Sequence, residues 1–225
     1  MNNIWYLSPS NQGANIGVDG YGSERDQMYL LTLEITPHLD RAGVSFVVPE
    51  RTVSLTERVR QSNSLGARFH LALHSNAGGG GKACGPVGLY YSDAGKDLCQ
   101  SLVAALLSLG QQSNRSYHVK QEKSLYELRK TKAPAALLEV DFHDSSTGVA
   151  FITKRRSEIA EAIARVIIEA DGKQFVPQVS NEAHEEAVKL GLFPAGTDWK
   201  TPMSKGDGAL LALKLKAILE GGEEK

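Results

Sequence analysis

The stretch Ala135-Ala136-Leu137-Leu138-Glu139-Val140-Asp141-Phe142-His143-Asp144 decides the fold. It is an apolar run that ends in acid/base and metal-binding side chains, which is typical of a buried strand of an open α/β sheet. A second stretch has the same form: Phe69-His70-Leu71-Ala72-Leu73-His74-Ser75-Asn76-Ala77, followed by a run of glycines. We interpret the two stretches as the halves of one metal site at the edge of a sheet.

Segments typical of strands and of helices alternate around these two stretches. Further strands are expected at 4–7, 44–48 and 87–91, and helices at 24–35, 55–65, 97–109 and 157–170. The alternation predicts an α/β fold with a mostly parallel twisted sheet flanked by helices on both faces. We expect a catalytic domain over residues 1–175. Residues 181–225 are expected to form a small helical C-terminal appendage, which is too short to enclose a large core alone.

The composition excludes several classes of protein. The formal net charge is −1, so no global basic field favours nucleic acid. No run of about 18 apolar residues predicts a membrane span. The N-terminus lacks the basic and long apolar regions of a secretory signal, so we expect synthesis in the cytoplasm without a signal peptide. The two cysteines, Cys84 and Cys99, are expected to be free thiols.

The candidate site residues lie at the ends of the two expected strands. His74 precedes the glycine run and can ligate zinc through a neutral ring nitrogen, although backbone hydrogen bonds could equally satisfy it. Glu139 follows an apolar run, so burial would raise its pKa and suit a general base; pairing with a lysine or arginine is the alternative. Residues 139, 141 and 143 would share one face of a regular strand. His70 is expected to be structural.

These residues resemble the zinc-dependent N-acetylmuramoyl-L-alanine amidases of the amidase-3 type. The resemblance covers about residues 3–172. It depends on Leu73-His74-Ser75-Asn76-Ala77, on 85–91, and on the pattern from Leu128 to Phe142, while Gly22-Ser23-Glu24 matches the position of a ligand glutamate. It implies that Glu24 and His74 are zinc ligands and that Glu139 is the general base. Taken alone, Glu24 would be explained by the preference for acidic residues in a first helical turn.

One departure from the family affects the metal site. The family usually opens with a strand followed by aspartate, proline, glycine and a ligand histidine, whereas this chain reads Leu7-Ser8-Pro9-Ser10-Asn11-Gln12. His143 is the expected replacement for the third ligand, because it would lie on the Glu139 face of the last strand. Asn11 or Gln12 could instead ligate through an amide oxygen, which binds zinc less well than imidazole does.

The resemblance implies one zinc ion per chain and hydrolysis of the bond between N-acetylmuramic acid and L-alanine in peptidoglycan. Asn76 and Arg129 are expected to bind substrate. A phage-type endolysin that reaches the wall after release is the expected context. One alternative is an inactive relative that binds peptidoglycan or a protein partner, and another is a different metal amidohydrolase that acts on a small amide. The C-terminal helices could bind cell wall or mediate homo-oligomerisation.

Overall fold

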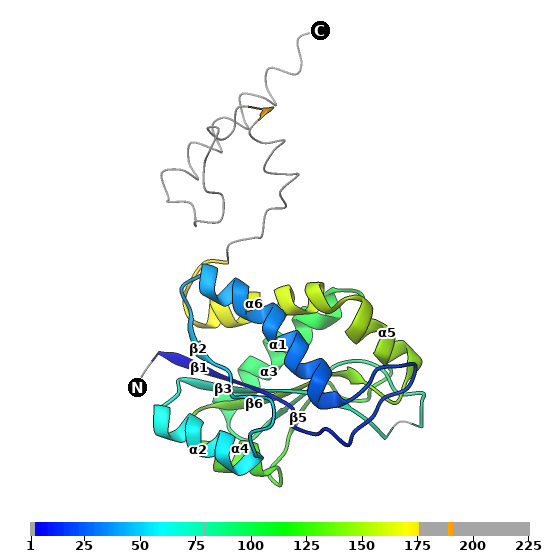
Figure 1. Cartoon of the computed structure of the whole chain (residues 1–225), viewed down its shortest axis with the longest axis horizontal. Helices are drawn as coiled ribbons and strands as arrows, with labels where there is room; N and C mark the ends of the chain where they lie inside the picture. The colour runs from blue at the N-terminus through cyan, green and yellow to red at the C-terminus, as the bar shows by residue number, and fades with distance from the viewer. Residues whose placement is uncertain (1–2, 79, 176–188, 191–225) are drawn as a thin grey trace. The chain divides into compact units, whose positions relative to one another are not determined.

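The computed structural model describes residues 3–78, 80–175 and 189–190, and its centre is a six-stranded sheet (Figure 1). The strands are β1 (Ile4–Pro9), β2 (Ser45–Val47), β3 (Phe69–Asn76), β4 (Val87–Tyr90), β5 (Val119–Gln121) and β6 (Ala135–Phe142). Their order across the sheet is β2-β1-β3-β6-β4-β5. Strands β2, β1, β3 and β6 are parallel, while β4 runs antiparallel to β6 and parallel to β5.

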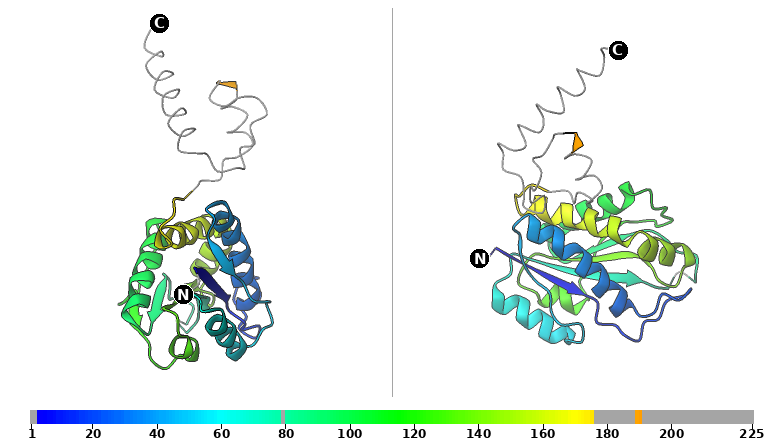
Figure 2. Two further views of the ribbon diagram at one scale, coloured as in Figure 1. Left: turned by 90° about the vertical axis from the view of Figure 1, so that its left-hand side faces the viewer. Right: turned by 45° about the horizontal axis from the view of Figure 1, so that its top comes forward.

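Helices cover both faces of this sheet. On one face lie α1 (Glu24–Arg41), α3 (Asp93–Ser108), α5 (Ser146–Lys154) and α6 (Arg156–Ala170), and on the other lie α2 (Leu55–Leu65) and α4 (Tyr126–Lys130) (Figures 1 and 2). The predicted fold class, a mostly parallel sheet between two helical layers, is confirmed. The sequence reading missed β5, α4 and α5, which are three, five and nine residues long, too short for a clear hydrophobic period.

The two faces of the sheet differ in chemistry. The large apolar core lies on the α1, α3 and α6 side and includes Trp5, Leu7, Leu71, Leu73 and Leu138, all fully buried. Among the described residues, the apolar cluster on the α2 and α4 side is smaller and consists of Ala72, Leu128, Ala135 and Leu137, with Leu89 and Leu125 packed against it. Buried polar side chains, among them Arg58, His70 and Glu127, fill other parts of the space between the sheet and α2 and α4.

The chain divides into two units, residues 1–175 and 176–225. The predicted C-terminal appendage, apart from residues 189 and 190, lies outside the described residues. Both cysteines are free, as expected. Among the described residues, no helix is both long and apolar enough to cross a membrane.

Candidate active site

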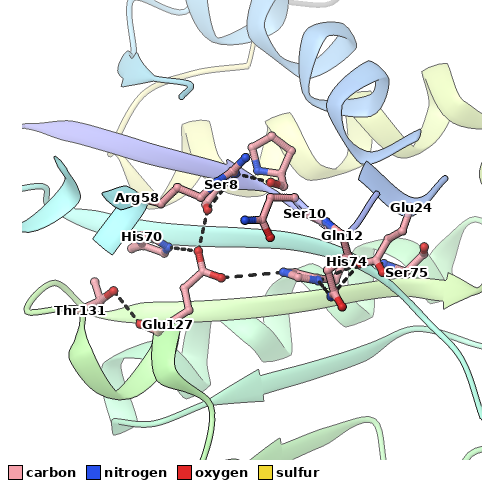
Figure 3. Close-up of polar contacts among 12 residues, drawn as sticks. Ser8, Ser10, Gln12, Glu24, Arg58, His70, His74, Ser75, Glu127 and Thr131 are labelled. Atoms are coloured by element: carbon pink, nitrogen blue, oxygen red, sulfur yellow. Dashed lines mark hydrogen bonds and ion pairs between the residues drawn. The ribbon is translucent and has the colours of Figure 1, made fainter. Parts of the chain in front are cut away.

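The candidate active site lies where β1, β3 and β6 end together. In parallel strands the carboxyl ends meet at one edge, and here the register places Pro9 opposite Leu73 and His74 opposite Glu139. The loop that leaves β1 returns to this edge at Glu24, the first residue of α1. Three segments far apart in the sequence therefore bring their polar side chains to one place (Figure 3).

Glu24 and His74, the two zinc ligands that the resemblance implies, lie in contact at this edge, and their role as ligands stays a prediction. Glu24 is 1% exposed, and its Oε1 lies 2.8 Å from Nδ1 of His74. Asn15 donates a hydrogen bond of 2.7 Å to the other oxygen of Glu24. Burial alone would raise the pKa of Glu24, but the interaction with His74 outweighs it, and the pKa is lowered. Glu24 is thus an anion at the carboxyl edge of the sheet. Its contacts with His74 and Asn15 go beyond the favourable interaction of an acidic residue with the helix dipole.

His74 has a carboxylate on each side of its ring. Its Nε2 lies 3.8 Å from Oε2 of Glu127, on the side opposite Glu24. Burial would lower the pKa of the imidazole, but the carboxylates of Glu127 and Glu24 outweigh burial and raise the pKa to about 10. The two carboxylates therefore favour a positive charge at the position of the ring.

Glu139 has the environment predicted for a general base. Its side chain is partly buried, and Oε2 is buried without a hydrogen-bond partner among the described residues. Burial is the largest cause that raises its pKa, to about 7; the charge of His74 acts in the opposite direction. The alternative pairing with a lysine or arginine is not what the structure shows, because no salt bridge involves Glu139 in the described part of the chain.

His143 has no contact with Glu24 or His74 among the described residues, and its role as the third zinc ligand stays a prediction. The step from His74 to Asn76 on β3 pairs with the longer step from Glu139 to Phe142 on β6, so β6 carries one extra residue in a β-bulge. The bulge breaks the alternation that would have kept 139, 141 and 143 on one face. His143 instead lies with Nδ1 2.9 Å from Ser75 Oγ and stacks on Tyr21.

Asp141 is turned to the helical layer by the same bulge. Its Oδ1 accepts hydrogen bonds from the backbone N–H groups of Gly85 and Phe142, and Gln111 donates to Oδ2. Asp141 is fully buried and fixes the loop before β4, so its contacts are structural.

The two predicted substrate-binding residues lie at different parts of the edge. Asn76 ends β3, and its Oδ1 accepts a hydrogen bond from the backbone of Ala77 at the start of the glycine run. Arg129 is on α4, exposed, and its side chain makes no hydrogen bond or ion pair within the described residues. Their roles in binding stay predictions.

Gln12 is the group that the β1–α1 loop places against the Glu24–His74 pair. Its Nε2 lies 3.3 Å from His74 Nδ1 and 3.5 Å from Glu24 Oε1. Asn11, the other candidate amide, points elsewhere and donates to the backbone oxygen of Val53. The sequence could not decide between Asn11 and Gln12, because the direction of a side chain in a loop does not follow a hydrophobic periodicity.

The donor set can be compared with the needs of a zinc ion. Among the described residues, no group of three His, Cys, Asp or Glu side chains could hold a metal ion. An imidazole, a carboxylate and an amide do converge, and rotation of the exposed Gln12 amide would present its oxygen in place of its nitrogen. The residues fit a zinc site of two strong ligands and one weak ligand.

The sequence analysis did not predict one residue of the site, Glu127, or its contact with His70. Positions 70 and 74 share one face of β3, so a carboxylate that reaches that face can meet both rings. His70 Nε2 lies 2.9 Å from Glu127 Oε1. The period of two in β3 could have indicated the shared face, but nothing in the sequence placed Glu127 there.

Fold and site together define an α/β domain with a cluster of carboxylate and imidazole side chains at the carboxyl edge of its sheet. Residues 8–169 match the model of the N-acetylmuramoyl-L-alanine amidase family of the amidase-3 type. The chain belongs to this family.

Three relatives illustrate the similarity. The chain is 26% identical over 174 residues to the N-acetylmuramoyl-L-alanine amidase CwlM of Bacillus licheniformis, an alignment that covers 71% of this chain and 64% of CwlM. It is 27% identical over 194 residues to the sporulation-specific N-acetylmuramoyl-L-alanine amidase of Bacillus subtilis, covering 84% of this chain and 74% of that protein. The catalytic domain of CwlV from Bacillus (Paenibacillus) polymyxa var. colistinus shares the fold: its TM-score is 0.67 at 19% identity, over 77% of this chain and all of that domain. The chain thus spans just under two thirds of the length of CwlM.

Proposed function

We propose that this chain hydrolyses the amide bond between N-acetylmuramic acid and L-alanine in peptidoglycan, with zinc as its cofactor. The observation that carries the proposal is the meeting of the Glu24–His74 pair with the partly buried carboxylate of Glu139. Membership of the amidase family supports the bond that is cleaved. The names of both curated relatives give the same activity for those proteins.

Glu24, His74 and the amide oxygen of Gln12 would hold the zinc ion. Zinc in such a site polarises the scissile carbonyl and makes water a nucleophile near neutral pH. Imidazole and carboxylate are common zinc ligands, and the amide is the weakest of the three. We therefore expect zinc to bind, but less tightly than to a site that has two histidines.

Glu139 would move the proton. A carboxyl whose pKa is about 7 is partly deprotonated at neutral pH, so it can accept a proton from the attacking water. Once protonated, the same carboxyl can donate to the nitrogen of the leaving L-alanine, because its environment does not strongly favour the anion. The unpartnered Oε2 is the atom available for this transfer.

The proposed biological setting is the bacterial cell wall. Peptidoglycan is the proposed partner, and the wall is the proposed place of action, after synthesis in the cytoplasm. We propose a lytic enzyme of the phage endolysin type; the names of CwlM and the sporulation amidase support an autolysin equally well.

A second candidate function is peptidoglycan binding without turnover. The observation in its favour is that the described residues hold no third His, Cys, Asp or Glu ligand beside Glu24 and His74. A site that loses zinc could keep the shape needed to hold the substrate.

The test combines metal analysis with product analysis. Purified chain is supplied with zinc and incubated with muropeptides, and new α-amino groups on L-alanine are measured with and without a chelator. We expect chelator-sensitive release that is lost in Glu139→Gln and His74→Ala and kept in Glu169→Gln, a control on the exposed surface of α6. A chain that binds peptidoglycan, holds no zinc and releases no L-alanine amine would establish the second candidate instead.

A further inference from the structure

Glu127 lies beneath the active site, and the proposed chemistry does not use it. It belongs to the short helix α4 that precedes β6, and the residue is 4% exposed. Its carboxylate lies between the two imidazoles of β3, with Oε1 at 2.9 Å from His70 Nε2 and Oε2 at 3.8 Å from His74 Nε2 (Figure 3). A buried carboxylate in this place needs a reason beyond packing, because burying a charge is costly.

The two nitrogens of the His74 ring face different groups. Nδ1 faces Glu24 and Gln12, the other groups that would hold zinc. Nε2 faces Oε2 of Glu127 at 3.8 Å. A histidine binds a metal through one nitrogen only when the proton resides on the other, and an acceptor beside that other nitrogen fixes this tautomer.

We propose that Glu127 is a positioning residue that accepts the Nε2 proton of His74 and so directs the lone pair of Nδ1 towards Glu24 and Gln12. The inference builds on the proposed zinc site and adds a residue that acts on the ligand rather than on zinc. The distance of 3.8 Å is too long for a hydrogen bond, and a displacement of roughly 1 Å would complete one. Catalytic hydrogen bonds are often long in ligand-free proteins and shorten when the site is filled.

The surroundings of Glu127 leave one oxygen free for this purpose. Ser8 donates a hydrogen bond of 2.6 Å to Oε1, the same oxygen that His70 approaches. His70 Nδ1 is buried without a partner in the described part of the chain, which is less costly for a bare lone pair than for an N–H group. His70 is therefore the donor to Oε1 through Nε2–H, and Oε2 remains directed at His74.

Arg58 stabilises the carboxylate of Glu127 through Ser8. It is 1% exposed, and its Nη1 donates to Ser8 Oγ at 3.4 Å and to the carbonyl oxygen of Pro9. Its Nε donates to the backbone oxygen of Val53. Ser8 lies between this buried guanidinium and the carboxylate, and the attraction between the two opposite charges helps Glu127 to stay ionised.

The backbone of α4 is fixed as well. Thr131 Oγ1 donates a hydrogen bond of 2.6 Å to the carbonyl oxygen of Glu127, and Asn63 donates to that of Lys130. Because five residues make a weak helix alone, these two contacts hold Glu127 at a defined depth. Rigid support of this kind is what a residue that orients a metal ligand requires.

The test compares Glu127→Gln with His70→Gln in the full chain. Glu127→Gln keeps the size of the side chain but replaces the carboxylate, so Nε2 of His74 loses its anionic acceptor. His70→Gln is the matched control, because the amide can still donate to Oε1 while Glu127 continues to face His74. We measure zinc affinity by chelator competition with zinc alone. In zinc-loaded protein labelled with ¹⁵N-histidine, NMR shows which nitrogen of His74 carries the proton.

We expect zinc to bind His74 through Nδ1 in the wild type, with a slowly exchanging Nε2 proton. Zinc affinity should fall ten- to a hundredfold in Glu127→Gln and change less than threefold in His70→Gln, in line with the effects of groups behind metal ligands. Thermal unfolding without metal shows whether either variant is misfolded; if Glu127→Gln is, Ser8→Ala, which leaves the carboxylate in place but loosens it, should speed exchange of the Nε2 proton.

Three results would overturn the inference. One is zinc bound through Nε2 in the wild type. Another is wild-type affinity and an unchanged His74 spectrum in Glu127→Gln. The third is an equal loss of affinity in His70→Gln, which would make the network merely structural. A wild-type chain that binds no zinc is a different failure, because it removes the proposed zinc function itself together with this role.

Discussion

In the metal-free protein, the free energy of unfolding of Glu139→Gln should increase relative to that of the wild type as the pH rises. The folded-state pKa of this carboxyl is about 7 against an ordinary value of 4.5, because burial disfavours the anion. A raised pKa means that the folded state binds the proton more tightly than the unfolded state does. Its stabilising contribution is therefore complete below pH 4.5 and is lost as the pH rises through 7.

The size of the effect follows from these two values. One pH unit between them corresponds to about 1.4 kcal/mol, so the wild type should lose at most about 3 kcal/mol between pH 5 and pH 8 through this group. The side chain is partly exposed, which makes this figure an upper bound. Glutamine has nearly the same shape and does not titrate, so the free energy of unfolding of Glu139→Gln relative to the wild type should rise by about 2–3 kcal/mol over that range.

Urea unfolding followed by circular dichroism, with a chelator present, measures this difference at pH 5, 6, 7 and 8. Glu169→Gln on the surface of α6 is the control and should follow the wild type at every pH. The same Glu139→Gln protein, loaded with zinc, should lose at least a hundredfold in turnover, the usual contribution of a general base. Parallel pH curves for wild type and Glu139→Gln would refute both the raised pKa and the reasoning that makes Glu139 the base.

Three further outcomes are expected. Gln12→His should tighten zinc binding at least tenfold, about 1.4 kcal/mol, in chelator competition, and unchanged or weaker binding would show that Gln12 is not at the metal. Iodoacetamide at pH 8 should alkylate Cys84 and spare Cys99 in the folded protein, because burial raises the Cys99 thiol pKa to about 12; equal rates by mass spectrometry would contradict this. Residues 1–175 expressed alone should unfold in one cooperative transition and keep any amidase activity, and a broad transition would contradict a self-contained unit.

The fold could be predicted from the sequence where buried elements are long enough to give a clear hydrophobic pattern. Strands β3 and β6 are covered on both faces and therefore read as continuous apolar runs, which located them. Strand β5 could not be found in this way, because it has three residues at the edge of the sheet and two of them, Lys120 and Gln121, are exposed. Helix α4 was missed for the same reason of length, and with it the position of Glu127.

The site was predictable only as far as regular geometry held. Glu24 and His74 were identified by resemblance, and the structure brings them to 2.8 Å. Glu139 was identified from its place after an apolar run, and its raised pKa agrees with that argument. The expectation that His143 shares one face of the strand with Glu139 did not allow for the extra residue in β6, and the sequence of this strand carries no signal of a β-bulge.

The bulge also determines where the rest of the site must come from. After the bulge, Asp141 accepts a hydrogen bond from the backbone of Gly85 and His143 lies against Ser75, so neither side chain contacts the Glu24–His74 pair among the described residues. Strand β3 contributes His74 to this edge, and its other histidine, His70, contacts Glu127 instead. The proposed zinc site would therefore be completed from the loop between β1 and α1, whose Gln12 side chain lies 3.3 Å from His74. Because Gln12 is exposed while Glu24 is buried, zinc affinity in this domain should be adjustable at position 12 without loss of fold.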